Sequence, residues 1–269
     1  MGCEIVLSAR MKALTEMVTP GSRVCDVGCD HGFVSVYLVQ QGISPRVLAM
    51  DVRQGPLSRA QEHIRQQGLE AYIETRLSDG LTAMEAGEAD ALICAGMGGR
   101  LMQRILTEGR EKAMALRELI LQPQSELPAF RAFLRQEGYV TVAENMIFEE
   151  GKYYPMMKVV PSGIYAGNAS GGRQRACSLE QRLWDHFGRL LLAQRHPVLE
   201  QYLLSAGENN RQILERLYQN ASDSSRTAER IRELEEELQL IRLALEQYKN
   251  AASTEQDRGA ADAASAVFR

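Results

Sequence analysis

The sequence predicts an α/β fold with a largely parallel sheet, followed by an all-α, coiled-coil-like domain. Three observations support this prediction. Short β-rich apolar runs alternate with helical patterns over residues 1–160, turn-forming residues cluster at 161–172, and only helical patterns follow. We therefore expect a first domain at 1–162, a helical domain at 173–250 and a disordered tail at 251–269.

The first domain contains seven apolar segments rich in β-forming residues. The expected strands are Arg23–Val27, Arg46–Asp51, Ala71–Leu77, Asp90–Ala95, Glu118–Gln122, Tyr139–Asn145 and Met156–Val160. Helical patterns lie between them near 33–41, 55–67, 99–107 and 128–137. This alternation implies a parallel sheet covered on both faces. The last two segments have no helix between them, so they are expected to form a hairpin.

A further helix is expected before the first strand. Leu7, Met11, Leu14 and Val18 recur at helical spacing, and Ser8 is a suitable N-cap. In the segment near 55–67, Pro56 stands where the helix would start, which predicts proline at the first helical position.

The C-terminal part carries a heptad pattern. Its apolar positions step by three and four residues, as in the seam of a coiled coil: Ile231, Leu234, Leu238, Ile241, Leu245 and Tyr248. The polar run at 220–225 predicts a turn between two antiparallel helices. The pattern leaves open whether the seam partner lies in the same chain or in a second copy.

Composition excludes several classes of protein. The chain is 45% hydrophobic and 25% charged, as in ordinary globular proteins, and its apolar runs are too short to cross a membrane. With no secretory signal visible, a cytoplasmic protein is expected. The net charge of −4 argues against non-specific coating of nucleic acid. It does not exclude a local basic face, and five arginines lie between 173 and 195.

Five cysteines do not form a disulfide or zinc pattern. Cys25, Cys29 and His31 lie close in sequence, but Cys25 falls within an apolar strand and no second pair of ligands follows. We expect no metal site.

The first expected strand runs into a glycine-containing turn that bears two carboxylates. Gly28 permits a sharp turn and Gly32 permits close packing of the next helix, while Asp26 and Asp30 supply negative charge. The spacing is not that of the dinucleotide fingerprint, which argues against a nicotinamide dehydrogenase. Carboxylates disfavour a pyrophosphate but suit S-adenosylmethionine, which carries an ammonium and a sulfonium group. His31 belongs to the same expected cofactor loop.

The ends of the next three strands continue this pattern. Asp51, followed by Val52, lies 23 positions after Gly28, near the spacing of an acid that binds ribose hydroxyls. Asp79 can accept a hydrogen bond from an adenine amino group, with Ser78 and Gly80 beside it. Gly96 and Met97 follow the fourth strand, where a methyl acceptor would approach. Polar residues at successive strand ends predict a methyltransferase that uses S-adenosylmethionine, with a Rossmann-like class I methyltransferase sheet.

The sequence also resembles one family, the bacterial TrmK-type tRNA methyltransferases. The resemblance covers roughly the first 160 residues and rests on Leu7–Met11, Asp26–Gly32, Asp51–Leu57, Asp79–Leu81, Ala95–Gly99, Leu121–Pro123 and Glu150–Tyr154. Cys29 and Gln124 depart from the family pattern near the presumed pocket. The resemblance implies methylation of N1 of adenine at position 22 of tRNA, and composition and periodicity do not show this substrate.

Candidate roles at the reacting base follow from that reaction. Attack by adenine N1 gives a cationic ring that can lose a proton from N6, and Asp30 and His31 are the candidate acceptors. Alternatively, Asp30 only binds the cofactor and His31 only shapes the loop. Tyr153 completes the expected catalytic set, because a target base removed from its stack needs a new stacking partner.

Further substrate contacts are expected around this site. Tyr154 is a second candidate for stacking on the base beside Tyr153, and Lys152 would contact the base or a phosphate. Met97 would form an apolar wall, and Arg10 and Arg53 would bind phosphates; plain packing or solvated surface positions are the alternatives. The arginine-rich segment at 173–195 would grip tRNA by releasing counterions, or would simply be a solvated helix face. Competing functions are a methyltransferase with another substrate and a non-catalytic tRNA-binding protein on the same fold.

Overall fold

The computed structural model describes residues 5–163, 178–219 and 225–266, with side chains up to Lys249. The chain divides into two compact units, Met1–Arg175 and Ala176–Arg269. The expected boundary segment lies largely outside the described residues, because residues 164–177 are not described.

The first unit is built on a seven-stranded sheet with the order β3-β2-β1-β4-β5-β7-β6. The strands are β1 (Val24–Val27), β2 (Val47–Asp51), β3 (Ile73–Leu77), β4 (Ala91–Met97), β5 (Glu118–Pro123), β6 (Tyr139–Glu149) and β7 (Lys152–Pro161). The first five run parallel, and β6 and β7 form an antiparallel hairpin against β5. The predicted α/β fold with a terminal hairpin is confirmed, although the hairpin strands extend further towards their turn than expected.

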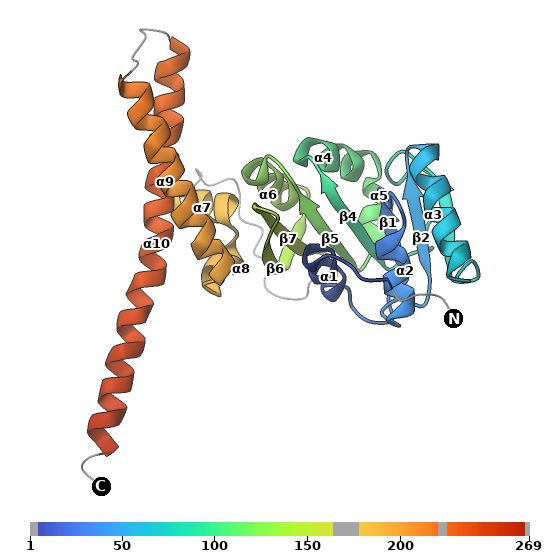
Figure 1. Ribbon diagram of the computed structural model, residues 1–269, viewed down its shortest axis with the longest axis horizontal. Helices are drawn as coiled ribbons and strands as arrows, with labels where there is room; N and C mark the ends of the chain where they lie inside the picture. The colour runs from blue at the N-terminus through green and yellow to red at the C-terminus, as the bar shows by residue number, and fades with distance from the viewer. Residues whose placement is uncertain (1–4, 164–177, 220–224, 267–269) are drawn as a thin grey trace. The chain divides into compact units, whose positions relative to one another are not determined.

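Helices cover both faces of this sheet (Figure 1). On one face lie α1 (Ala9–Glu16), α2 (Phe33–Gln40) and α3 (Gln54–Gln66). On the other lie α4 (Gly99–Glu108), α5 (Arg110–Ala115) and α6 (Leu127–Gln136). The short helix α5 was not expected from the sequence, because its six residues are too few to show a periodic pattern.

The helix starts confirm one sequence prediction and correct another. The hydroxyl of Ser8 accepts a hydrogen bond from the backbone N–H of Met11, so Ser8 is the N-cap of α1. The prediction for Pro56 was wrong by two positions, because α3 begins at Gln54 and Pro56 is its third residue. The third position also has no N–H partner within the helix, so proline is tolerated there equally well.

Each face of the sheet has its own hydrophobic core. Leu14, Val36 and Ile64 pack from α1, α2 and α3 onto one face, and Met102 and Phe130 pack from α4 and α6 onto the other. Alternating strand residues feed the two cores, so the central strands β1, β2, β4 and β5 are buried throughout or nearly so. This two-sided burial leaves the ends of the strands as the places where polar side chains can gather.

The second unit consists of α7 (Leu179–Phe187), α8 (Arg189–Ala193), α9 (Pro197–Gln219) and α10 (Ser225–Ala266). Helices α9 and α10 pack antiparallel, since Tyr218 Oη donates to Glu235 at 2.7 Å and Tyr248 Oη donates to the carbonyl of His196 at 3.2 Å. The helix α9 therefore provides a seam partner for α10 within the chain. The predicted turn between them falls on residues 220–224, which lie outside the described residues.

Helix α10 continues to Ala266 and so covers part of the segment at 251–269 that was expected to be a disordered tail. Residues 251–266 are rich in alanine, the residue with the highest helix propensity. Among the described residues, no helix is both long enough and apolar enough to cross a membrane.

Candidate active site

The sheet topology places one site at the carboxyl ends of the parallel strands. From β1 the strand order runs outward to β2 and β3 on one side and to β4 and β5 on the other. The connections after β1 and β4 therefore diverge and leave a crevice between the two strand ends, where open α/β sheets bind ligands. The loops after β1, β2, β3 and β4 carry most of the residues predicted for the cofactor.

The loop after β1 depends on backbone geometry that favours glycine. Gly28 and Gly32 have φ angles of 78° and 74°, and Asp30 between them has 47°, in the left-handed region that aspartate tolerates. A Cβ atom at Gly28 would lie 2.2 Å from Cε of Met97, and one at Gly32 would lie 3.0 Å from Cβ of Ala60. The two glycines thus let the loop pass under Met97 and against α3.

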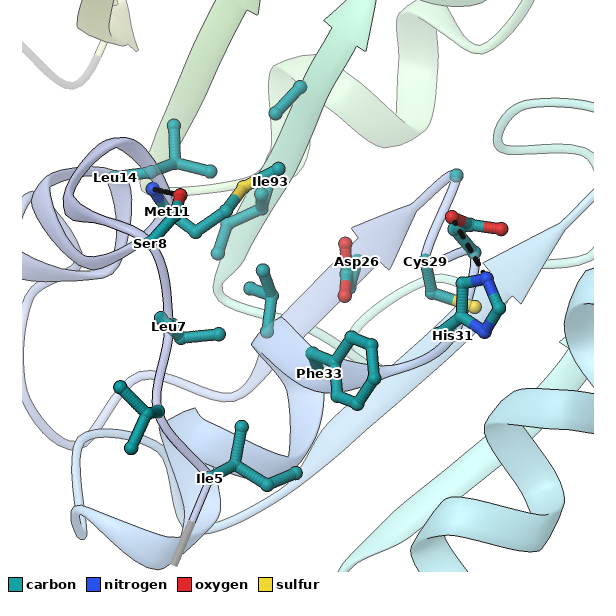
Figure 2. A pocket seen from close by; sticks show the side chains of 15 residues that line it. Ile5, Leu7, Ser8, Met11, Leu14, Asp26, Cys29, His31, Phe33 and Ile93 are labelled. Atoms are coloured by element: carbon teal, nitrogen blue, oxygen red, sulfur yellow. Dashed lines mark hydrogen bonds and ion pairs between the residues drawn. The ribbon is translucent and has the colours of Figure 1, made fainter. Parts of the chain in front are cut away.

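This loop forms one wall of a cavity of about 480 Å³ (Figure 2). Four residues predicted to bind the cofactor line the cavity: Asp26, Gly28, Asp30 and His31. Figure 2 shows the Asp26 carboxylate between the side chains of Leu7 and Ile93 and the rings of Phe33 and His31. The cavity therefore joins a few polar groups to mostly apolar walls, a composition typical of small-molecule sites.

Asp26 is buried in this cavity without a cationic partner among the described residues. The Ser35 hydroxyl donates to its Oδ2 at 2.7 Å. Burial raises the pKa of Asp26 to about 6, the Ser35 hydrogen bond lowers it in part, and the charge of Asp51 raises it further. The site thus contains a desolvated carboxylate whose charged form a nearby cation would stabilise.

Asp51 at the end of β2 is also buried and accepts hydrogen bonds from the backbone. Its two oxygens accept from the N–H groups of Arg53 at 2.8 Å and Asp30 at 3.4 Å. These bonds fix the carboxylate beside the β1 loop, although Asp51 does not line the cavity itself. Val52, which follows it, is 58% exposed and leaves an apolar surface open at this strand end.

Asp30 and His31 lie at the mouth of the cavity, where both are solvent-accessible. His31 Nε2 is 3.6 Å from Asp30 Oδ2, and Arg59 of α3 approaches the other oxygen to 4.0 Å. The predicted acceptor pair is therefore brought together, in contact with solvent that could take a released proton.

At the end of β3, Asp79 forms a two-pronged ion pair with Arg104 of α4, with N–O distances of 2.8 and 3.0 Å. This guanidinium holds the pKa of Asp79 below its usual range. Ser78 supports the turn, because its hydroxyl accepts from Ala83 N–H and donates to the Gly80 carbonyl. An adenine amino group would have to share the Asp79 carboxylate with Arg104.

At the end of β4, backbone and side chains shape the place for a methyl acceptor. Gly96 has a φ of 76°, and its N–H donates to Oε1 of the buried Gln122 at 3.2 Å. The Gln124 N–H donates to the Met97 carbonyl at 2.8 Å, and its side-chain amide nitrogen lies 3.8 Å from where a Gly96 Cβ would be. The β5 end thus braces the β4 turn that holds Met97 over Gly28.

The predicted substrate residues of the hairpin lie beyond this edge of the sheet. Because β7 is antiparallel to β5, with Leu121 opposite Met157, its first residues lie past the end of β5. Strand alternation points Tyr153 and Tyr154 to opposite faces. Tyr153 packs against Phe148 with ring centroids 4.6 Å apart, and the Arg10 guanidinium lies 4.5 Å from the centroid of the Tyr154 ring.

Tyr153 and Tyr154 therefore cannot both face one base. Arg10 forms a cation–π contact with Tyr154 and does not extend towards solvent. Its backbone N–H also donates to Glu149 at 3.2 Å. Lys152 is exposed, and Arg53 is exposed with its Nε 3.9 Å from Asp51 Oδ1, so both side chains are accessible to a charged ligand. None of these predicted substrate residues lines the described cavity.

The comparisons with known proteins assign this architecture to a family. A model of the methyltransferase domain matches residues 7–157, more than half of the chain. The chain belongs to this methyltransferase family. Its first unit is therefore the methyltransferase domain, and the strand ends described above lie within it.

Several relatives of this methyltransferase match both of its units. A protein of Bacillus subtilis named tRNA (adenine(22)-N(1))-methyltransferase is 28% identical over 239 residues, which is 89% of this chain and 97% of that one. The crystal structure of the B. subtilis m1A22 tRNA methyltransferase TrmK has 26% identity and a TM-score of 0.74, covering 90% and 99% of the two chains.

A crystal structure of Streptococcus pneumoniae Sp1610 in complex with S-adenosyl-L-methionine has 29% identity and a TM-score of 0.74, covering 89% of this chain and 100% of that one. The predicted resemblance to the TrmK-type family and the predicted class I methyltransferase fold are confirmed.

Sequence reasoning missed the N-terminal wall of the methyltransferase cavity. The extended segment Ile5–Ser8 lines it together with Met11 and Leu14 of α1, and Phe33 lines it from α2. The backbone N–H of Ile5 donates to Gln40 of α2 at 3.1 Å, which ties this segment to the domain. The signal was present, because Leu7, Met11 and Leu14 form one stripe, but periodicity alone cannot separate a core face from a cavity face.

Proposed function

We propose that this methyltransferase transfers a methyl group from S-adenosylmethionine to N1 of adenine at position 22 of tRNA. The observation that carries the proposal is the similarity to the B. subtilis tRNA (adenine(22)-N(1))-methyltransferase, which spans both units. Ribosomal protein L11 methyltransferases match more narrowly, for example 83 residues and 26% of the Symbiobacterium thermophilum protein. The match that extends over both units is thus the one with the tRNA enzyme.

The residues at the β1 and β2 ends fit S-adenosylmethionine. Its ammonium and sulfonium groups are cations, and Asp26 is a buried carboxylate that lacks one. Asp51 is fixed beside the loop as an acceptor for ribose hydroxyls, and Asp79 is an acceptor for the adenine amino group. Gly28, Gly32 and Gly80 let the strand-end loops pack closely against Met97, Ala60 and Ile105. Val52, Ser78 and Gly96 lie at the neighbouring strand ends.

S-adenosylmethionine supplies an activated methyl group on sulfur, so the chain mainly has to position the acceptor. The proposal requires no metal ion for activation. Met97, braced by the β5 end, forms the apolar wall beside the transfer path. Asp30 and His31 receive the N6 proton, directly or through solvent, because they lie together at the cavity mouth.

The target adenine must leave its stack in the RNA before its N1 can be reached. In this proposal Tyr153 contacts the extruded base, while Tyr154 and Arg10 act as a paired support for the hairpin edge. Lys152 and Arg53 contact neighbouring phosphates. A tRNA substrate would also place the enzyme in the cytoplasm.

The helical unit is assigned to tRNA binding through its surface cations. Of the arginine-rich segment, Arg182 is engaged with Glu236 of α10 at 2.8 Å, whereas Arg189 is exposed on α8. The phosphate-binding role therefore rests on arginines such as Arg189 rather than on the whole segment.

The test is methyl transfer from labelled S-adenosylmethionine to unmodified tRNA transcripts with adenine or guanine at position 22. We expect label only in the adenine transcript, located at N1 of that base. Labelling of both transcripts, or of neither, would contradict the proposal.

A further inference from the structure

Three aromatic rings with similar orientation lie at the mouth of the cavity. His31 of the β1 loop, Phe33 at the start of α2 and His63 of α3 have centroids 4.8 to 6.0 Å apart and interplanar angles of 16° to 26°. We call these residues the aromatic triplet. Figure 2 shows two of its rings, His31 and Phe33, bordering the cavity near Asp26.

The triplet is ordered by its own contacts and is still accessible to solvent. The His63 Nδ1–H donates to the His31 carbonyl at 2.9 Å, which joins α3 to the β1 loop. The Phe33 side chain is 44% exposed and the His31 side chain 36% exposed. These two rings therefore present aromatic surface on which a ligand can pack.

We propose that the aromatic triplet is a stacking surface for an unpaired RNA base next to the target adenine. The proposal rests on the proposed tRNA function and adds a substrate contact to the same site. Rings that stack on one another leave an outer ring face and ring edges open, and RNA-binding proteins stack single-stranded bases on aromatic side chains of this kind. When the target base leaves the RNA stack, its neighbours also lose a stacking partner, so such a surface would stabilise the opened RNA.

The surrounding charges favour a base over a phosphate as the ligand. Asp30 lies 3.6 Å from His31, and its carboxylate would repel a phosphate placed on the rings. Arg59 lies on the other side of Asp30, at 4.0 Å, and is 53% exposed. It can contact the backbone of the same nucleotide while the base covers the triplet.

The cofactor adenine is a less suitable occupant. Its predicted acceptor, Asp79, lies at the end of β3, whereas His63 belongs to α3 and does not line the cavity. Covering the triplet would move the adenine away from the Asp79 acceptor. The experiment below separates these two occupants, because it measures the affinity for each ligand.

Two substitutions of His63 separate its ring from its hydrogen bond. His63→Phe keeps an aromatic ring and removes the bond to the His31 carbonyl. His63→Asn removes the ring and keeps a donor near the position of Nδ1. Tyr72→Leu is the matched control, because Tyr72 is another exposed aromatic residue and lies before β3, at the opposite edge of the sheet.

The measurements are dissociation constants for the adenine-22 tRNA transcript and for S-adenosylmethionine, with the melting temperature of each variant. We expect His63→Asn to bind tRNA at least about fivefold more weakly, and His63→Phe and Tyr72→Leu to bind it like the wild type. The cofactor affinity should be unchanged in all three. Wild-type methylation of the same transcript tests the underlying function separately.

Three results would overturn the stacking surface while leaving that function intact. One is wild-type tRNA affinity in His63→Asn. Another is an equal loss in His63→Phe and His63→Asn, which would assign the effect to the hydrogen bond. The third is a loss of cofactor affinity with unchanged tRNA affinity, which would assign the rings to the cofactor.

Discussion

At the amino-terminal edge of the sheet, Asp90 lies between Arg23 at 2.8 Å and Arg117 at 3.8 Å. Beside it, Lys158 approaches the buried Glu118 to 2.6 Å. At the carboxyl-terminal edge, the equally buried Asp26 has only a serine hydroxyl. Asp90 and Glu118 are thus neutralised by arginine or lysine at one edge, whereas at the other edge Asp26 has no cationic partner among the described residues, although Asp30 and Asp79 there do.

The contrast between the paired Asp90 and the unpaired Asp26 distinguishes a carboxylate that stabilises the fold from one that suits a ligand site. The pKa of Asp90 is lowered to about 2 by its hydrogen bonds with Arg23, whereas burial raises the pKa of Asp26 to about 6. The first carboxylate stabilises the folded protein in its charged form, and the second destabilises it. Proteins retain such an unfavourable buried charge at sites where a bound ligand compensates it, and this fits a site for a cationic cofactor.

The largest effect is expected from Gly28→Ala. A Cβ there would displace the Met97 side chain, and a misplaced transfer path lowers kcat/KM by about 100-fold. Gly68→Ala is the control, because Gly68 also has a positive φ but no atom within 4 Å of the new Cβ. Both variants should lose about 1–2 kcal/mol of unfolding free energy from backbone strain. Equal activities of the two variants would contradict the role of Met97.

Asp26→Asn and Asp90→Asn should change stability in opposite directions at pH 7. The first should raise the unfolding free energy by roughly 2 kcal/mol and weaken S-adenosylmethionine binding at least about tenfold. The second should lower the unfolding free energy by about 1–2 kcal/mol and leave cofactor binding unchanged. Chemical denaturation and calorimetric titration measure both quantities. A loss of stability in Asp26→Asn would show that its charge is already compensated.

The two carboxylates should also respond to pH in separate ranges. The folded-state pKa of Asp26 is above its ordinary value of 3.8, so its stabilising protonated form is present below that value and lost as pH rises through about 6. The pKa of Asp90 is below 3.8, so its contribution is present above that value and lost as pH falls towards about 2. In chemical denaturation from pH 3 to 8, Asp26→Asn and the wild type should differ little in unfolding free energy below about pH 4. The difference should grow as the pH rises towards about 6.

The smallest effect is expected from Arg104→Gln. Its ion pair with Asp79 is exposed, so the melting temperature should not change measurably. The cofactor affinity should fall by only about two- to threefold, because Asp79 loses an orienting partner but keeps its charge. Arg65→Gln, which breaks the exposed pair with Glu62 on α3, is the control and should change neither.

The sequence was sufficient to predict which side chains gather at the ends of the parallel strands. Asp26 lies in the apolar strand β1, Asp51 ends β2 and Asp79 follows β3, and parallel strands bring such ends to one edge without knowledge of side-chain packing. The alternation of strands and helices likewise predicted the sheet and its terminal hairpin. These features depend on local pattern and topology, which a single sequence records.

Contacts between distant segments could not be predicted in this way. The fork between Asp79 and Arg104, the stacking of Arg10 on Tyr154 and the aromatic triplet join residues from different elements. Their formation depends on how helices rotate against the sheet. The dual role of the stripe at Leu7 and Met11 was hidden for the same reason, since burial in a core and exposure to a cavity give the same periodicity.

The most direct test of the unpaired carboxylate is proton release on cofactor binding. Titration of the protein with S-adenosylmethionine at pH 6, in buffers of different ionisation enthalpy, measures the number of protons exchanged. An Asp26 with a pKa near 6 is half protonated there, so binding a cation beside it should release about half a proton, and Asp26→Asn should release none. No release by the wild type, or equal release by both proteins, would contradict the assignment of Asp26 as the partner of the cationic cofactor.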